Sequence, residues 1–173
     1  MFTPSFRRVI VTVAVICLCS GCENKKGIQI GDTPPGVSGK DIQGEDISRI
    51  VLRGKVIVIY FWTDSCCGGS LKKLEPFFRK NRDKGLVLLA VNEGDTQEMV
   101  ASYAKNNALT FTMLRDEKFK LFKQYQVVGF PTIFILDQDG VVREKILGDI
   151  QTEKLQTLVE RQFKTSPGNG DQS

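Results

Sequence analysis

The chain has 173 residues, of which 41% are hydrophobic and 25% charged, so it can bury one substantial core and we expect a single folded domain. Its net charge of +4 falls to +2 without Arg7 and Arg8 near the N-terminus, and acidic residues are interspersed with the basic ones, which argues against a nucleic-acid partner. There is no histidine, which excludes Ser/His and Cys/His catalytic dyads and imidazole-based zinc sites.

The N-terminus has the pattern of an export signal, with two arginines before the apolar run Val9–Leu18. This run is too short to span a bilayer, which takes about 20 residues. The following residues, Leu18–Cys22, resemble a bacterial lipobox. The resemblance implies that residues 1–21 are a signal peptide and that Cys22 carries the lipid; the alternative is plain secretion with Cys22 as a free thiol.

Residues 22–35 are polar and contain Gly31, Pro34 and Pro35, so we expect a tether between the membrane and the domain. The domain is predicted to cover residues 36–165, and the polar residues 166–173 are predicted to be a disordered tail. The predicted location is the bacterial cell envelope, where the lipid-anchored domain would face the periplasm or the outer side of the cytoplasmic membrane.

The first half of the domain predicts a β-α-β unit. Gly54–Trp62 is an unbroken apolar run typical of a buried central strand, and Ser70–Arg82 has apolar residues at helical spacing, with Pro76 expected to kink the helix. A second strand, Gly85–Val91, leads to a capping-box-like helix start at Asp95–Glu98.

Two shorter elements follow. Leu109–Leu114 predicts a short strand, and Asp116–Tyr125 predicts a short helix with Phe119 and Phe122 facing inward.

A hairpin and a helix close the domain. Pro131–Leu136 and Val141–Leu147 flank an Asp-Gly turn signal, which predicts two antiparallel strands. Thr152 is placed to cap a last helix whose apolar residues recur at helical spacing, namely Leu155, Leu158, Val159 and Phe163.

Three stretches together resemble the thioredoxin-like superfamily, and within it the TlpA/ResA branch related to the AhpC/TSA redoxins. They are residues 31–35 with 53–58, Phe61-Trp62 four residues before Cys66, and residues 128–137 followed by Gly140. The resemblance implies an α/β thioredoxin fold, with a central mixed sheet flanked by helices on both faces. It also implies a membrane-tethered thiol-disulfide oxidoreductase of the cell envelope.

The resemblance also implies the site. In that family the proline matching Pro131 is cis, and its turn faces the cysteine and pairs with the backbone of a bound substrate. The implied site comprises the catalytic Cys66 and Cys67, the substrate-binding Trp62, Gly129, Phe130 and Pro131, and the supporting Thr63 and Ser70. No cofactor and no metal are expected.

The cysteine run departs from the family's Cys-x-x-Cys pattern, because this chain reads Cys-Cys-Gly-Gly-Ser from Cys66. If Cys66 takes the first family position, Gly69 takes the second. If Cys67 does, the second is Ser70. The sequence leaves both alignments open.

A cysteine at a helix N-terminus is exposed to unpaired backbone N–H groups and the positive end of the helix dipole, which stabilise its thiolate. Lys72 and Lys73 would add to this effect, and Asp64 would oppose it. The alternative is a pair of inert structural thiols.

Adjacent cysteines are poorly placed for a disulfide, whose Cα atoms are usually about 4.4 to 6.8 Å apart, because neighbouring Cα atoms lie about 3.8 Å apart. A Cys66–Cys67 bond would therefore be strained and oxidising, and the site could instead trap substrates as mixed disulfides. The leading hypothesis is thiol-disulfide exchange, reductase or isomerase-like, with Cys66 attacking and Cys67 assisting. Its partners would be protein thiols or disulfides and a membrane or envelope electron donor.

Two other functions compete. Thr63-Asp64-Ser65-Cys66 fits the Thr-x-x-Cys signature of a peroxiredoxin-type thiol peroxidase, although Ile59 stands where that signature has a proline. A redox-inactive binding or assembly lipoprotein is the second competitor, with two thiolates offering a soft metal an incomplete site.

Three further positions bear on proton transfer, for which Glu75 and Glu93 are candidate distant acids. Tyr60 stands where cytoplasmic thioredoxins carry a buried aspartate, so that acid is missing here. Glu75 and Glu93 are expected to be solvated surface carboxylates.

Overall fold

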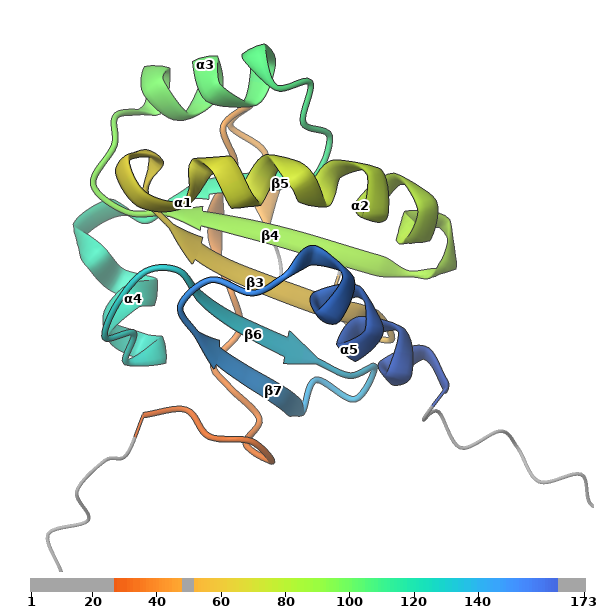
Figure 1. Cartoon of the computed structure of the whole chain (residues 1–173). Coiled ribbons are helices and arrows are strands. Elements are labelled where there is room, and N and C mark those ends of the chain that lie inside the picture. Colours follow the sequence, from red (N-terminus) through yellow and green to blue (C-terminus); the bar gives the residue numbers. More distant parts are fainter. Residues whose placement is uncertain (1–26, 48–51, 165–173) are drawn as a thin grey trace, which may run out of the picture.

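The computed structural model describes residues 27–47 and 52–164, in which a five-stranded mixed sheet has the order β5-β4-β3-β6-β7 (Figure 1). β3, β4 and β5 are parallel to one another, β6 is antiparallel to β3, and β7 is antiparallel to β6, which confirms the predicted mixed α/β sheet. The strands are β3 (Val56–Trp62), β4 (Leu86–Asn92), β5 (Thr112–Arg115), β6 (Thr132–Leu136) and β7 (Val142–Leu147).

The helix after β3 begins earlier than predicted. α1 covers Asp64–Leu71, and a 3-10 turn, η2 (Lys72–Leu74), joins it to α2 (Glu75–Asn81), which ends in η3 (Arg82–Lys84). Pro76 lies in the first turn of α2, where a missing N–H costs least. Because α1 starts directly after the strand, both cysteines lie inside its first turns.

The later helices follow the prediction except around Phe119. α3 covers Gln97–Asn106, and the hydroxyl of Thr96 accepts a hydrogen bond from the Met99 amide as its cap. The predicted helix over 116–125 is split into η4 (Glu117–Phe119) and α4 (Lys120–Tyr125), and α5 covers Thr152–Lys164.

The prediction that Phe119 faces inward is wrong, because 45% of this residue is exposed. Lys118 and Phe119 both have positive φ angles, 60° and 57°, which break the helical path between η4 and α4. Phe122, one turn later, is half-buried against the core as expected.

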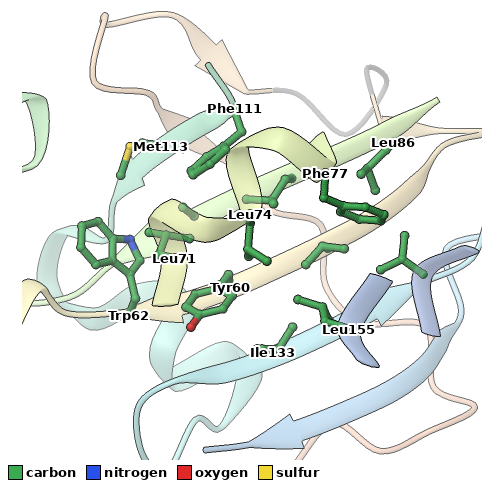
Figure 2. Packing of buried hydrophobic residues seen from close by; sticks show 14 of the residues in the cluster. Tyr60, Trp62, Leu71, Leu74, Phe77, Leu86, Phe111, Met113, Ile133 and Leu155 are labelled. Atoms are coloured by element: carbon green, nitrogen blue, oxygen red, sulfur yellow. The ribbon is translucent and has the colours of Figure 1, made fainter. Parts of the chain in front are cut away.

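Two cores lie on the two faces of the sheet. One packs α1, α2, α3 and α5 against residues such as Tyr60 and Trp62, and Figure 2 shows Leu71, Leu74 and Phe77 covering this face of β3. The other packs α4 against the opposite face, where the alternate residues Ile59 and Phe61 point. Helices therefore flank both faces, as predicted.

The N-terminal segment runs from one edge strand of the sheet, β7, to the other, β5. Gly31 and Asp32 exchange backbone hydrogen bonds of 2.8 and 2.9 Å with Val142 of β7. Further on, β1 (Gly39–Lys40) pairs with β2 (Asp46–Ile47), and Ile42 donates its amide to Met113 of β5 at 3.0 Å.

The part of the predicted tether that the structure describes, residues 27–35, thus packs against the domain. The Tyr125 hydroxyl donates to the Pro35 carbonyl at 2.6 Å, and the Lys145 ammonium donates to the Ile28 carbonyl at 2.8 Å. The predicted signal peptide, Cys22 and the predicted tail from 166 lie outside the described residues.

Across residues 27–47 and 52–164, no helix combines the length and the apolar composition that a membrane span requires.

Candidate active site

Three chain segments meet at the carboxyl end of β3. The register pairs Phe61 with Thr132, so Pro131, the residue before Thr132, lies beside Trp62, the last residue of β3. The parallel strand β4 ends at the same edge, where α1 begins (Figure 1). The start of α1, the turn before β6 and the loop after β4 therefore surround one site.

The two cysteines differ in exposure. Cys66 is exposed, whereas Cys67 is only 3% exposed and packs in the core beneath α1 with Leu71, four residues later. A disulfide joins the two sulfur atoms, and the Cα atoms are 3.8 Å apart. A molecule approaching from solvent therefore meets the sulfur of Cys66 first.

One hydroxyl group contacts the Cys66 sulfur. Thr63, the residue that precedes α1, donates its hydroxyl to the Cys66 sulfur at 3.4 Å, and this hydroxyl also lies 3.1 Å from the Ser65 hydroxyl. Thr63 makes no side-chain hydrogen bond to the amides of the helix it precedes.

The two positions considered for a second family cysteine have different environments. Gly69 is exposed, and a Cβ atom there would meet nothing within 4 Å. Ser70 donates to the Asp149 carboxylate at 2.9 Å, and the neighbouring Gly148 amide donates to the Pro131 carbonyl at 2.8 Å. These bonds connect α1 to the proline turn through the loop before α5.

The peptide bond between Phe130 and Pro131 is cis. Pro131 is buried, Gly129 and Phe130 are half-buried, and the preceding Val128 is 79% exposed. Leu147, 60% exposed, lies beside Gly129, 3.5 Å from where a Cβ on that glycine would be. Exposed apolar side chains therefore flank this turn.

Trp62 is fully buried and supports α1 from below. Its ring lies 4.8 Å from that of Tyr103 in α3, and the Tyr103 hydroxyl donates to the Gly68 carbonyl of α1. Burial raises the pKa of Tyr103 to about 12, so the hydroxyl keeps its proton and remains a donor. Trp62 and α3 together fix the height of the cysteine helix above the sheet.

The group that caps α1 is not evident from the sequence. Asp95 accepts the Asp64 amide, the first of α1, at 3.0 Å and the Asn92 side-chain amide at 2.7 Å. The sequence pattern assigns Asp95 only to the start of the next helix. The only available signal was the polar run after β4, which does not reveal a partner 31 residues earlier.

The prediction that Glu75 is solvated is wrong. The residue is 8% exposed, and its carboxylate accepts bonds from the Thr110 amide at 2.9 Å, the Thr110 hydroxyl at 2.6 Å and Arg79 at 2.6 Å. Burial raises the pKa of Glu75, but these hydrogen bonds outweigh it, and the net pKa is lowered. Glu75 is a structural anion that joins α2 to the loop before β5.

The same prediction is wrong for Glu93, which is 2% exposed at the end of β4. Neither carboxyl oxygen has a hydrogen-bond partner of normal geometry among the described residues. Burial raises the pKa of Glu93 to about 9, and the nearby carboxylate of Asp116 adds to the rise. Glu93 is therefore protonated at neutral pH.

Tyr60, below α1 on the same face of β3 as Trp62 (Figure 2), is buried, and its hydroxyl has no hydrogen-bond partner among the described residues. Burial, with the Asp149 charge, raises the pKa of Tyr60 well above its ordinary value.

Within the described residues, no group of three or more Cys, Asp or Glu side chains is arranged to hold a metal ion.

Comparison with known proteins places this site in a redox context. The model of the AhpC/TSA family matches residues 30–145. The thiol-disulfide oxidoreductase ResA of Bacillus cereus is 29% identical over 140 residues, covering 80% of this chain and 81% of that protein. The sporulation thiol-disulfide oxidoreductase A of Bacillus subtilis is 32% identical over 126 residues, covering 70% and 76%.

Solved structures of thiol-disulfide oxidoreductases resemble this chain as well. StoA from Bacillus subtilis superimposes with a TM-score of 0.61 at 28% identity, covering 73% of this chain and 98% of that one. A thioredoxin-family thiol:disulfide interchange protein from Chlorobium tepidum gives a TM-score of 0.71 at 18% identity, covering 80% and 97%, which supports the fold.

Proposed function

This chain belongs to the AhpC/TSA family and is a thioredoxin-like thiol-disulfide oxidoreductase of TlpA/ResA type, and from this premise we propose that it acts on envelope proteins through Cys66 and Cys67. The observation that carries the proposal is the exposed sulfur of Cys66 beside a buried Cys67 in the first turns of α1, next to the cis-Pro131 turn.

In the reducing direction, the Cys66 thiolate attacks a substrate disulfide, forms a mixed disulfide and releases one substrate thiolate, which takes up a proton. Cys67, deprotonated, then attacks the Cys66 sulfur and releases the other substrate sulfur as a thiolate. Alternatively, a second substrate thiolate attacks the substrate sulfur of the mixed disulfide, which forms a new substrate disulfide and releases the Cys66 thiolate. With Cys67 the pair ends oxidised, so an envelope thiol donor must return two electrons. With a substrate thiol the outcome is isomerisation.

The surrounding residues have supporting positions in this scheme. The half-buried residues Gly129 and Phe130 would contact an extended substrate at the proline turn, and Trp62, being buried, acts through the placement of α1. Thr63 donates a hydrogen bond to the attacking sulfur, and Ser70 ties the helix to the proline turn through Asp149.

Single cysteine variants of the full chain test the proposal with a fluorescent disulfide peptide as substrate. Cys66→Ser should lose more than about 90% of the exchange rate, whereas Cys67→Ser should accumulate a peptide adduct on Cys66, visible by mass spectrometry. An exchange rate in Cys66→Ser equal to that of the parent protein would contradict the proposal.

Membrane attachment through Cys22 is a separate part of the proposal and has its own test. Cys22→Ser should abolish incorporation of labelled palmitate and release the protein from the membrane fraction. Cys17→Ser, which lies outside the residues that resemble the lipobox, is the matched control and should keep the label. Label that persists in Cys22→Ser would exclude this anchor.

The hydrogen bond from Thr63 to Cys66 favours thiol peroxidase activity as the second candidate. A peroxidase would use this hydroxyl to orient the peroxide at the Cys66 thiolate. Measuring peroxide consumption with a thiol donor distinguishes the two functions. A rate of peroxide consumption that exceeds the rate of disulfide exchange, and that falls in Thr63→Val, would favour the peroxidase.

A further inference from the structure

The helix that carries the cysteines is capped by a residue from another loop. An N-cap residue usually uses its own side-chain oxygen to accept an amide of the helix. Thr63 occupies that position but directs its hydroxyl to the Cys66 sulfur, at 3.4 Å, and makes no cap bond. The first amide of α1, that of Asp64, donates to the Asp95 carboxylate at 3.0 Å instead.

Asp95 is held in place for this contact. Asn92, the fully buried last residue of β4, donates its side-chain amide to the Asp95 carboxylate at 2.7 Å, and its side-chain oxygen lies 3.3 Å from the Asp95 amide. Since Asn92 pairs in register with Trp62, the loop that carries Asp95 starts beside the residue that precedes Thr63.

The charge of Asp95 acts on the same helix end as the Cys66 thiolate. A helix rises about 1.5 Å per residue, so the amide that Asp95 accepts lies about 3 Å along the axis from that of Cys66. A carboxylate at a helix N-terminus offsets the positive end of the dipole and repels a second anion there. Asp64, exposed in the first turn, adds a charge of the same sign.

We propose that Asp95 is a positioning residue with two effects: its carboxylate caps α1 so that Thr63 is free to donate to Cys66, and its negative charge lowers the fraction of Cys66 present as thiolate. The second effect makes Cys66 less reactive than a cysteine at an uncapped helix end. The inference deepens the proposed function, since Cys66 is the attacking sulfur there.

The test measures alkylation of Cys66 by iodoacetamide in the reduced full chain carrying Cys67→Ser, followed on the peptide that contains Cys66. Asp95→Asn keeps an oxygen that can accept the Asp64 amide but removes the charge. We expect its alkylation rate at pH 7 and low salt to rise about two- to fivefold, the size of a charge effect at a helix end.

Asp83→Asn is the matched control, because Asp83 is exposed in η3, beyond the far end of α2, and its removal should leave the rate unchanged. An alkylation rate in Asp95→Asn that equals or falls below that of the parent protein would overturn the proposal, because a purely structural cap predicts no increase.

Salt dependence provides a second measurement. Raising the ionic strength from about 0.01 to 1 M shortens the screening length from about 30 to 3 Å, so the ratio of the Asp95→Asn rate to the parent rate should fall towards one. A ratio that does not change with salt would contradict the charge effect. Alkylation needs no protein substrate. The alkylation rates therefore test this inference independently of the exchange assay, which tests the proposed function.

Discussion

Glu93 lies at the end of β4 with both carboxyl oxygens buried, near the Asp116 carboxylate. Asp116 accepts the Leu121 and Phe122 amides at 3.0 and 2.8 Å and so stabilises the start of α4 as an anion. The proton on Glu93 is what allows two carboxyl groups to share this position.

Stability should therefore fall with rising pH at this residue. The pKa of Glu93 is raised from 4.5 to about 9 on folding, so its contribution is fully present below 4.5 and is lost as the pH rises towards 9. The loss is at most about 1.4 kcal/mol per pH unit. Glu93→Gln should remove this dependence, so urea unfolding should show the variant gaining on the parent protein between pH 5 and pH 9.

Glu160→Gln is the control for that comparison, because Glu160 is exposed on α5. It should follow the pH profile of the parent protein. A parallel profile in Glu93→Gln would mean that Glu93 is ionised in the folded protein.

At the residue scale, the sequence marks Cys66 and Cys67 as candidate site residues through a local motif, and the family resemblance adds the Pro131 turn. Asp95 and Asp149 were not predicted, since their bonds to α1 span 31 and 79 residues and depend on where two loops end. Glu93 was misjudged because a glutamate after a strand is usually solvated.

Among the elements, α1 contains two adjacent glycines whose surroundings differ. A Cβ on Gly68 would lie 2.7 Å from the Asp64 carboxylate and 3.0 Å from the Tyr103 ring, whereas one on Gly69 would meet nothing within 4 Å. Gly68→Ala should cost about 1 to 3 kcal/mol through overpacking, and Gly69→Ala should gain up to about 1 kcal/mol from helix propensity. Thermal unfolding of the two variants checks this opposition, and a loss in both would contradict it.

The contact between α2 and the loop before β5 predicts an opposite pH dependence. The pKa of Glu75 is lowered on folding, so its contribution is present above the ordinary value of 4.5 and is lost as the pH falls below it. Glu75→Gln should lose about 1 to 3 kcal/mol at pH 7 and little at pH 3, measured by urea unfolding.

Thr110→Val removes only the hydroxyl that donates to Glu75 and keeps the amide bond, so it should cost less than Glu75→Gln at pH 7. An equal loss at pH 3 and pH 7 in Glu75→Gln would show that its charge is not what stabilises the contact.

The elements themselves were largely predictable, because β3, β4, β6 and α5 follow from apolar runs or helical spacing. The sequence pattern places the start of α1 six residues late, since its first six residues read Asp-Ser-Cys-Cys-Gly-Gly and lack an amphipathic pattern. The left-handed backbone at Phe119 overrides the helical spacing that placed this residue inside.

For the whole molecule, the N-terminal segment is expected to depend on Tyr125. Its hydroxyl donates to Pro35 at 2.6 Å across the second core, where the neighbouring Val37 is buried. Tyr125→Phe should cost about 1 kcal/mol and increase hydrogen exchange in residues 28–37. Exchange in α5 serves as the internal control, and unchanged exchange in the segment would contradict this role.

The course of that segment also bears on self-association. Exposed outer strands offer free backbone groups to other chains, which favours intermolecular pairing. Here Gly31 and Asp32 form hydrogen bonds with the backbone of β7, and Ile42 forms one with the backbone of β5. One stretch of chain therefore covers part of both edges of the sheet. A protein held at high local density on a surface would gain from this protection, because its neighbours find fewer open positions at which to add a strand.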